Sequence, residues 1–430
     1  MNEDFLAYVW KFQYFDKTNL QTESGEPLSV LRTGMQNANA GPDFLHASLK
    51  IADLTWAGSV ELHVKASDWF RHRHTSDQKY DQVILHVVWE NDVPVLRTNN
   101  SEVPVLALEN RVAPALLQTY LKLKQSRLTI PCEPFLSQIS GLTKTAMLER
   151  ALLERLELKA ERIRNLYKAS GNNWEETAYA ALLSGYGFKI NQAGFEKLAK
   201  QLPYKILLKH RHQTLQTEAL LFGQAGFLAG NFPDDLYLQQ LQKEFGYLKH
   251  KYDLPEPLQA SDWNFLRMRP ANFPTVRLAQ LAALFTSREH LFSFFLADHS
   301  LKAFETFFFA KPSAYWQTHY MPGRSGKFKI GSIGKSSVNI LLINIVAPLL
   351  VAYAHETGQL ALVEKALNLL EMLPPEKNHI LTMYEGLGFE NKAASQSQGL
   401  LALGQNYCQP VRCLHCAIGN GILKRTKTAS

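Results

Sequence analysis

The sequence predicts an α+β fold, in which a small mixed α/β domain over residues 1–125 precedes a larger all-helical domain over residues 126–430. Short runs rich in β-branched residues dominate up to about residue 125, whereas apolar residues recur at helical spacing beyond it. A chain of 430 residues also exceeds the usual size of a single hydrophobic core. Together these observations predict two domains of different class.

The first domain is expected to begin with a helix over residues 5–15 and to continue as strands. Its strand-like runs are separated by turn signals such as Asn91-Asp92 and Asn99-Asn100. The runs are PLSVLRTG, LHASLKIA, TWAGSVELHVK, QVILHVVWE, VPVLRT and EVPVLAL.

The second domain is expected to be almost entirely helical, without a fixed-period repeat. Helical spacing marks residues 142–168, 174–183, 214–229, 277–285, 301–309 and 360–373. The longest apolar run, residues 340–354, is interrupted by Asn344 and Pro348 and is shorter than a membrane span. We therefore expect this run to form a buried helix.

The composition is that of a soluble globular protein, with 46% hydrophobic and 20% charged residues, and it excludes a disordered chain. The N-terminus lacks the basic start and the cleavage site of a secretory signal, so a cytoplasmic location without a membrane partner is expected. The formal net charge of +7 is compatible with an anionic partner such as nucleic acid.

The segment most suited to chemistry is the strand-like run that carries Glu61, His63 and Lys65. Alternate residues of a strand point to the same face, so these three side chains are expected to lie together. If the run pairs with the preceding one as a hairpin, Asp43 comes beside Glu61. Two carboxylates so placed can hold Mg²⁺ or Mn²⁺, and His63 or Lys65 can orient an attacking water. The alternative is an ordinary half-exposed antiparallel strand.

Histidines are concentrated around this run. Imidazoles bind metals and transfer protons near neutral pH, so His72 and His74 are candidates for the rim of the site and for substrate binding. His72 and His74 with Asp77 form a less favoured zinc site, because the helical i,i+4 spacing is lacking. Of 14 histidines, five lie in this part of the chain: His46, His63, His72, His74 and His86.

A cysteine cluster near the C-terminus predicts a second metal site. The chain has only four cysteines, and Cys408, Cys413 and Cys416 lie within nine residues. Stable disulfides are not expected in a cytoplasmic protein, so the leading interpretation is a bound Zn²⁺ or iron–sulfur cluster. Cys132 and His415 are the candidates for the fourth ligand. The alternative is a set of unligated core thiols.

Arginines in the segment WNFLRMRPANFPTVR are candidates for contacts with phosphate. Arg267, Arg269 and Arg277 surround two prolines just ahead of a predicted helix, and guanidinium groups bind phosphate through two parallel hydrogen bonds. The alternative is a loop between two helices that the arginines brace.

The order Pro42-Asp43, a hairpin and then Glu61 resembles the PD-(D/E)xK nuclease superfamily. The resemblance implies a restriction-endonuclease-like domain, with Asp43 and Glu61 as metal-binding acids and Glu26 as a further carboxylate. This sequence departs from the pattern at the lysine. His63 stands two residues after Glu61, so either His63 replaces the lysine or Lys65 reaches in from the next pleat.

Across nearly its whole length the chain resembles the DUF2851 family of uncharacterised bacterial proteins. The motifs that carry this resemblance are NANAGPDF, GSVELHVKASDW followed by His72 and His74, RMRPANFP, IGKSS and the terminal YC-x3-RC-x2-CAIG. The family implies a recurring architecture and no established activity. Two hypotheses therefore remain: a metal-dependent nuclease acting on DNA or RNA, and a non-catalytic protein that binds nucleic acid or protein and carries a structural metal site.

Overall fold

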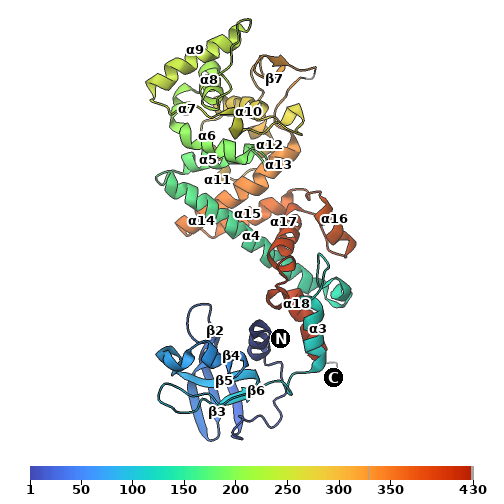
Figure 1. Cartoon of the computed structure of the whole chain (residues 1–430). Coiled ribbons are helices and arrows are strands. Elements are labelled where there is room, and N and C mark those ends of the chain that lie inside the picture. The colour runs from blue at the N-terminus through green and yellow to red at the C-terminus, as the bar shows by residue number, and fades with distance from the viewer. Residues whose placement is uncertain (328, 428–430) are drawn as a thin grey trace. The chain divides into compact units, whose positions relative to one another are not determined.

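The computed structural model describes residues 1–327 and 329–427 (Figure 1). The chain divides into two compact units. The first comprises Met1–Leu148 together with the segment that begins at Leu403, and the second is Glu149–Ala402. The fold is α+β, as predicted, with a mixed sheet near the N-terminus and helices through most of the remainder. The units differ from the division expected at residue 125, because the C-terminal segment belongs to the first unit.

The sheet of the first unit has six strands in the order β1-β3-β4-β5-β6, with β2 paired to β3. β1 and β2 are antiparallel to β3, and β3 and β4 form an antiparallel hairpin. β5 is parallel to both β4 and β6. The strands are β1 (Leu28–Arg32), β2 (Met35–Gln36), β3 (Phe44–Ile51), β4 (Leu54–Lys65), β5 (Val83–Glu90) and β6 (Val105–Ala107).

The expected strand at residues 93–98 does not form. Leu96 makes only an isolated antiparallel bridge with Glu102. Pro94 has no N–H group to donate to a neighbouring strand, and the Asn99-Asn100 turn follows immediately, with Asn100 at a φ of 61°. This part of the chain is therefore a loop that leads into β6.

The N-terminal helix α1 (Glu3–Phe12) packs against β4 and β5. The side chain of Asn2 caps it by accepting a hydrogen bond from Phe5 N at 3.2 Å. The helix ends three residues before the expected residue 15, because Gln13 adopts a left-handed conformation with φ of 51°. The packing of α1 on β4 and β5 places this helix, which carries Glu3 in its first turn, beside the sheet.

The first unit also contains helices from both of its chain segments. α18 packs against α3, η3 and η8. The aromatic rings of Phe5 and Tyr120 stack at 4.4 Å and join α1 to α3. The elements are α2 (Asp68–Arg71), η1 (His74–Ser76), η2 (Gln78–Tyr80), α3 (Pro114–Lys124), η3 (Glu133–Gln138), η7 (Gly404–Cys408), η8 (Cys413–His415) and α18 (Ala417–Lys427).

The second unit is helical apart from a short β7–β8 pair, and the predicted helices are present. α4 (Gly141–Ala169) runs from the first unit into it. The others are α5 (Trp174–Tyr186), α6 (Gln192–Gln201), α7 (Tyr204–His210), α8 (Thr214–Gln224), α9 (Leu236–Lys251), η4 (Ala260–Asp262), η5 (Pro270–Asn272), α10 (Pro274–Ser287), α11 (Leu291–Leu296), α12 (Leu301–Phe308), β7 (His319–Met321), β8 (Arg324–Ser325), α13 (Lys335–Leu341), η6 (Leu342–Val346), α14 (Ala347–Thr357), α15 (Ala361–Met372), α16 (His379–Gly386) and α17 (Ala394–Leu403).

The long apolar run lies in a continuous helix, Lys335–Thr357, with a π-helical turn at η6. This helix is long and apolar enough to cross a membrane, and 72% of its most apolar window is buried within the protein. Most of its residues between Leu341 and Ala352, though not Asn344 and Pro348, belong to the hydrophobic core of the second unit, as expected for a buried helix.

Candidate metal centre

Asp43 and Glu61 lie side by side because of the register of the β3–β4 hairpin. Phe44 pairs with Val60, so the residue before β3 reaches the level of Glu61. The two acids exchange hydrogen bonds through the backbone. Asp43 N donates to Glu61 Oε2 at 3.0 Å, and Leu62 N donates to Asp43 Oδ2 at 3.0 Å. The hairpin is thus formed as predicted, and it brings the two carboxylates together.

Both carboxylates are in an environment that disfavours their charge. Burial raises the pKa of Asp43 to about 7, with a further contribution from Glu61, against which the hydrogen bond from Leu62 N acts. Burial also raises the pKa of Glu61 to about 8. Glu3, in the first turn of α1, adds negative potential at both acids. A bound cation would offset this repulsion.

Four histidines surround Glu61. His74 Nε2 lies 3.2 Å and His63 Nε2 3.7 Å from Glu61 Oε1. His63 also makes a hydrogen bond with each of two further imidazoles, from its Nδ1 to His86 Nε2 at 2.8 Å and from its Nε2 to His72 Nδ1 at 3.0 Å. The ligand atoms of His63, His72 and His74 all lie within 4.8 Å of one another, which is a spacing that could hold a metal ion.

The loop after β4 positions His72 and His74. Asp68, at the start of α2, accepts a hydrogen bond from Lys65 N at 3.2 Å and pairs with Arg71 at 3.0 Å. Arg73 then takes a left-handed conformation with φ of 63°, which directs the chain into η1. As a result His74 is buried, whereas His72 is exposed.

Aromatic side chains enclose the imidazoles. Tyr80 stacks on His74 with ring centroids 3.7 Å apart, and Trp69 meets His74 edge-on at 5.4 Å. Burial lowers the pKa of His63 to about 2 and that of His86 to about 3, and it also lowers the pKa of His74. Because these imidazoles stay neutral, they are in the form that binds metal ions.

Two buried ring nitrogens in this cluster have no hydrogen-bond partner: His74 Nε2 and His86 Nδ1. His74 Nε2 is within ion-pair distance of Glu61 Oε1, yet the orientation of the two groups gives no hydrogen bond. Its lone pair is therefore available to a cation in the tautomer protonated at Nδ1. A metal bound here by His63 Nε2 would have His86 as the partner of the other ring nitrogen, as is usual for metal-binding histidines.

Two other predicted residues lie away from this cluster. Lys65 is half-exposed and pairs across the parallel strands with Glu90, at 3.1 Å. Glu26 is exposed and lies beside Pro27, which accepts a hydrogen bond from Ala52 N at the hairpin turn. This is the opposite end of β3 from Asp43, roughly 20 Å away along the strand. Glu26 is therefore not the additional carboxylate of the site, and Glu3 lies closer to both acids.

The three predicted arginines lie in the second unit. Arg277 is buried, with its guanidinium bonded to Gln280 Oε1 at 2.9 Å and to Asn272 Oδ1 at 2.8 Å, and it stacks on the ring of Phe188. Arg277 thus braces α10 instead of facing a ligand. Arg267 and Arg269 are exposed.

Two residues of the cluster, Glu3 and His86, were not among the predicted site residues. The parallel pairing of β4 with β5 places His86 opposite Glu61. A histidine inside the otherwise apolar run VILHVVWE was a signal that could have identified it. Glu3 reaches the site only through the packing of α1 on the sheet, for which the sequence gives no local signal.

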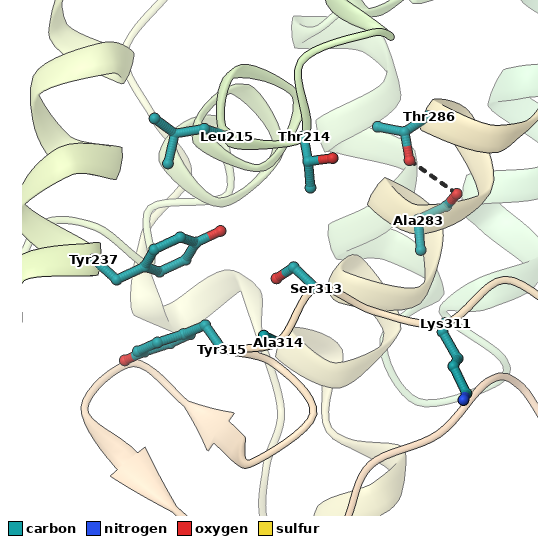
Figure 2. Close-up of a pocket in the computed structure, with 9 residues that line it drawn as sticks. All are labelled: Thr214, Leu215, Tyr237, Ala283, Thr286, Lys311, Ser313, Ala314 and Tyr315. Atoms are coloured by element: carbon teal, nitrogen blue, oxygen red, sulfur yellow. Dashed lines mark hydrogen bonds between the residues drawn. The ribbon is translucent and has the colours of Figure 1, made fainter.

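A separate pocket lies in the second unit, with a volume of about 660 Å³ (Figure 2). The rings of Tyr237 and Tyr315 stack at 4.7 Å on one side of it. Their hydroxyl groups donate to Glu218 and Asp235, respectively, so the polar ends of both rings are engaged within the protein. The lining residues are Thr214, Leu215, Tyr237, Ala283, Thr286, Lys311, Ser313, Ala314 and Tyr315, none of which was a predicted site residue.

Residues 3–379 match a family described as a protein of unknown function, DUF2851. No curated protein and no solved structure matches the chain.

Proposed function

The chain belongs to the DUF2851 family, and from the site on β3 and β4 we propose that it is a metal-dependent phosphodiesterase that acts on nucleic acid. The observation that carries this proposal is the pair of the half-buried Asp43 and the buried Glu61 beside three imidazoles whose ligand atoms lie within 4.8 Å of one another.

The donor set favours a divalent metal. Carboxylate oxygens of Asp43 and Glu61 suit Mg²⁺ and Mn²⁺, whereas imidazole nitrogens suit Zn²⁺ and other transition metals. Because His63 and His74 both approach Glu61, the mixed set favours Mn²⁺ or Zn²⁺ over the Mg²⁺ expected from the acids alone. A metal in such a site polarises a phosphoryl oxygen and lowers the pKa of bound water.

The protein groups around the metal donors have distinct roles in this proposal. His72 is exposed and hydrogen-bonded to His63, so it connects the buried imidazoles with solvent. The net charge of +7 favours the approach of a polyanionic substrate. The resemblance to the PD-(D/E)xK superfamily supports the same activity but stays a prediction. Since Lys65 pairs with Glu90, His63 is the residue that would replace the superfamily lysine.

A second candidate function is a non-catalytic binding protein in which the same site holds a structural metal. The observation in its favour is burial: Glu61, His63 and His86 are only 5%, 1% and 0% exposed. A metal held solely by these residues would be shielded from a polymeric substrate. Substrate access through Asp43 and His72, which are less buried, is what the catalytic proposal requires.

Cleavage assays test the proposal. Supercoiled plasmid and labelled single-stranded DNA and RNA are incubated with the full chain and Mg²⁺, Mn²⁺ or Zn²⁺, for the wild type and for Asp43→Asn and Glu61→Gln. Loss of either ligand should reduce cleavage by more than about 100-fold, beyond the usual effect of a residue that only orients a ligand. Glu26→Gln is the matched control, because it changes an exposed carboxylate at the far end of β3.

Metal binding is measured in parallel by calorimetry on chelator-treated protein. Cleavage that both substitutions leave unchanged would refute the proposal. Tight metal binding that both substitutions abolish, without cleavage of any of the substrates, would instead support the structural metal site.

A further inference from the structure

The four cysteines of the chain all lie in the first unit, although the second unit separates them in the sequence. Cys132 immediately precedes η3. The other three follow Leu403, in the segment that rejoins the first unit. For a chain of 430 residues with only four cysteines, this gathering calls for a common explanation.

Local structure delivers three of the cysteines to one place. Cys408 ends the π-helical turn η7, a kind of turn that is frequent at functional sites. Cys413 begins η8, and Cys416 N donates to Cys413 O at 3.2 Å, just before α18. A Cβ atom on Gly419 would lie 2.1 Å from Cys413 O, so the first turn of α18 sits directly on the backbone of Cys413.

The same helix brings Cys132 to the other three cysteines. α18 packs against both η8 and η3, and Cys132 is the residue just before η3. Cys408, Cys416 and Cys413 all lie close enough to the Cys132 thiol to act on it electrostatically. Four thiols from two distant parts of the chain therefore lie within electrostatic reach of one another.

The environment of these thiols suits a soft metal. Cys132, Cys408 and Cys416 are 7%, 8% and 6% exposed. Neighbouring thiolates repel one another unless a cation lies between them, and coordination to a metal removes their protons.

We propose that Cys132, Cys408, Cys413 and Cys416 bind one metal centre through four thiolates, as either a tetrahedral Zn²⁺ ion or an iron–sulfur cluster. Four thiolates complete the ligand set of both. His415, the other candidate for the fourth ligand, is exposed and not required. The centre joins the segment around Cys132 to the segment after Leu403, and so closes the first unit independently of the site on β3 and β4.

Metal analysis of the full chain, purified without oxygen, tests this proposal. We expect one sulfur-bound centre per chain, with metal–sulfur distances of about 2.3 Å by X-ray absorption for zinc. Broad visible absorption with bound iron and sulfide identifies the cluster, and colourless protein whose zinc is coordinated by sulfur identifies the ion. Cys413→Ser and Cys416→Ser should each reduce the bound content several-fold. His74→Ala is the control, because it alters the other metal site and should leave the sulfur-bound metal unchanged.

A thiol titration keeps the test valid if a cysteine variant does not fold. In the wild type, four thiols should become reactive only as a chelator removes the metal. Protein that binds neither zinc nor iron through sulfur, or whose four thiols react freely before chelation, would overturn the proposal. A disulfide between any two of these cysteines in the oxygen-free protein would do the same.

Discussion

Ionisation of the Asp43–Glu61 pair should make the metal-free protein less stable as the pH rises from 6.5 to 8. Burial raises the pKa of Asp43 to about 7 and that of Glu61 to about 8, against ordinary values of 3.8 and 4.5. In this window the folded protein holds protons that the unfolded chain has lost, so the free energy of unfolding falls with pH. The lowered pKa values of His63, His74 and His86 act in the opposite direction, chiefly below about pH 7, because the unfolded imidazoles are half charged at pH 6.5 and lose that charge as the pH rises.

The size of the effect follows from the two pKa values. Each proton held only by the folded state changes the free energy of unfolding by about 1.4 kcal/mol per pH unit. Between pH 6.5 and 8 the three histidines raise the free energy of unfolding by roughly 1 kcal/mol. Over the same range Asp43 releases most of its proton and Glu61 about half, so the two acids together lower it by an amount on the order of 2 kcal/mol. Glu61→Gln removes one acid and relieves the repulsion on Asp43, so the variant should lose less than half of that amount.

The assay is chemical denaturation in the presence of a chelator at closely spaced pH values, for the wild type and Glu61→Gln. The difference between the two proteins in the pH dependence of the free energy of unfolding isolates the site, because the contributions of the other titrating groups are the same in both and cancel. Added Mn²⁺ should reverse the trend, since metal binding is stronger when the carboxylates are ionised. A wild-type stability that is flat or rising from pH 6.5 to 8, or an equal slope in Glu61→Gln, would show that the pair is not protonated in the folded state.

Two further predictions concern residues around the metal sites. His86→Ala removes the hydrogen-bond partner of His63 Nδ1 and should weaken Mn²⁺ or Zn²⁺ binding by about 10- to 100-fold in calorimetry; an unchanged affinity would mean that His63 is not a ligand. Gly419→Ala places a methyl group against Cys413 O and should lower the stability of the first unit by about 1–3 kcal/mol in thermal unfolding. The control Gly421→Ala meets only the flexible end of a side chain at 3.2 Å and should lower the stability less. Equal effects of the two substitutions would contradict the close approach of α18 to Cys413.

The part of the site that depends on local pairing could be predicted from the sequence. Alternation of polar and apolar residues, with a Pro-Asp turn ahead of them, predicted the hairpin that joins Asp43 to Glu61. The packing of α1 and the parallel pairing of β4 with β5 involve separate parts of the chain. The packing of α1 leaves no local signal, so Glu3 could not be assigned to the site in the same way. His86 stood out as a histidine in an apolar run, but the sequence did not show that its strand pairs beside Glu61.

The sequence also could not show which of the predicted side chains would be buried or paired. The spacing of the arginines around Pro270 and Pro274 left two interpretations open, a phosphate contact and a loop braced by arginines. The burial of Arg277 against Phe188, with its bonds to Gln280 and Asn272, favours the second for this residue. Lys65 shares a strand with Glu61, but the partner strand offers Glu90 at its end and determines where the amine lies. In both cases the role of the basic side chain depends on its partner in the folded protein. Arg277 bonds to Gln280 one turn along its helix, and Lys65 pairs with Glu90 on another strand.

The division of the first unit into two chain segments has a consequence for the synthesis of the protein. Residues 1–148 are synthesised before the second unit, and the segment that begins at Leu403 is synthesised after it. The second unit, which is continuous, has its complete core before the first unit does, and domains of nascent chains fold as units. The sheet that carries the acids is therefore made before the second unit, whereas α18 and three of the four cysteines can join the first unit only after the second unit has been synthesised. A chain that stops after residue 402 would contain all of the helical core and an incomplete first unit.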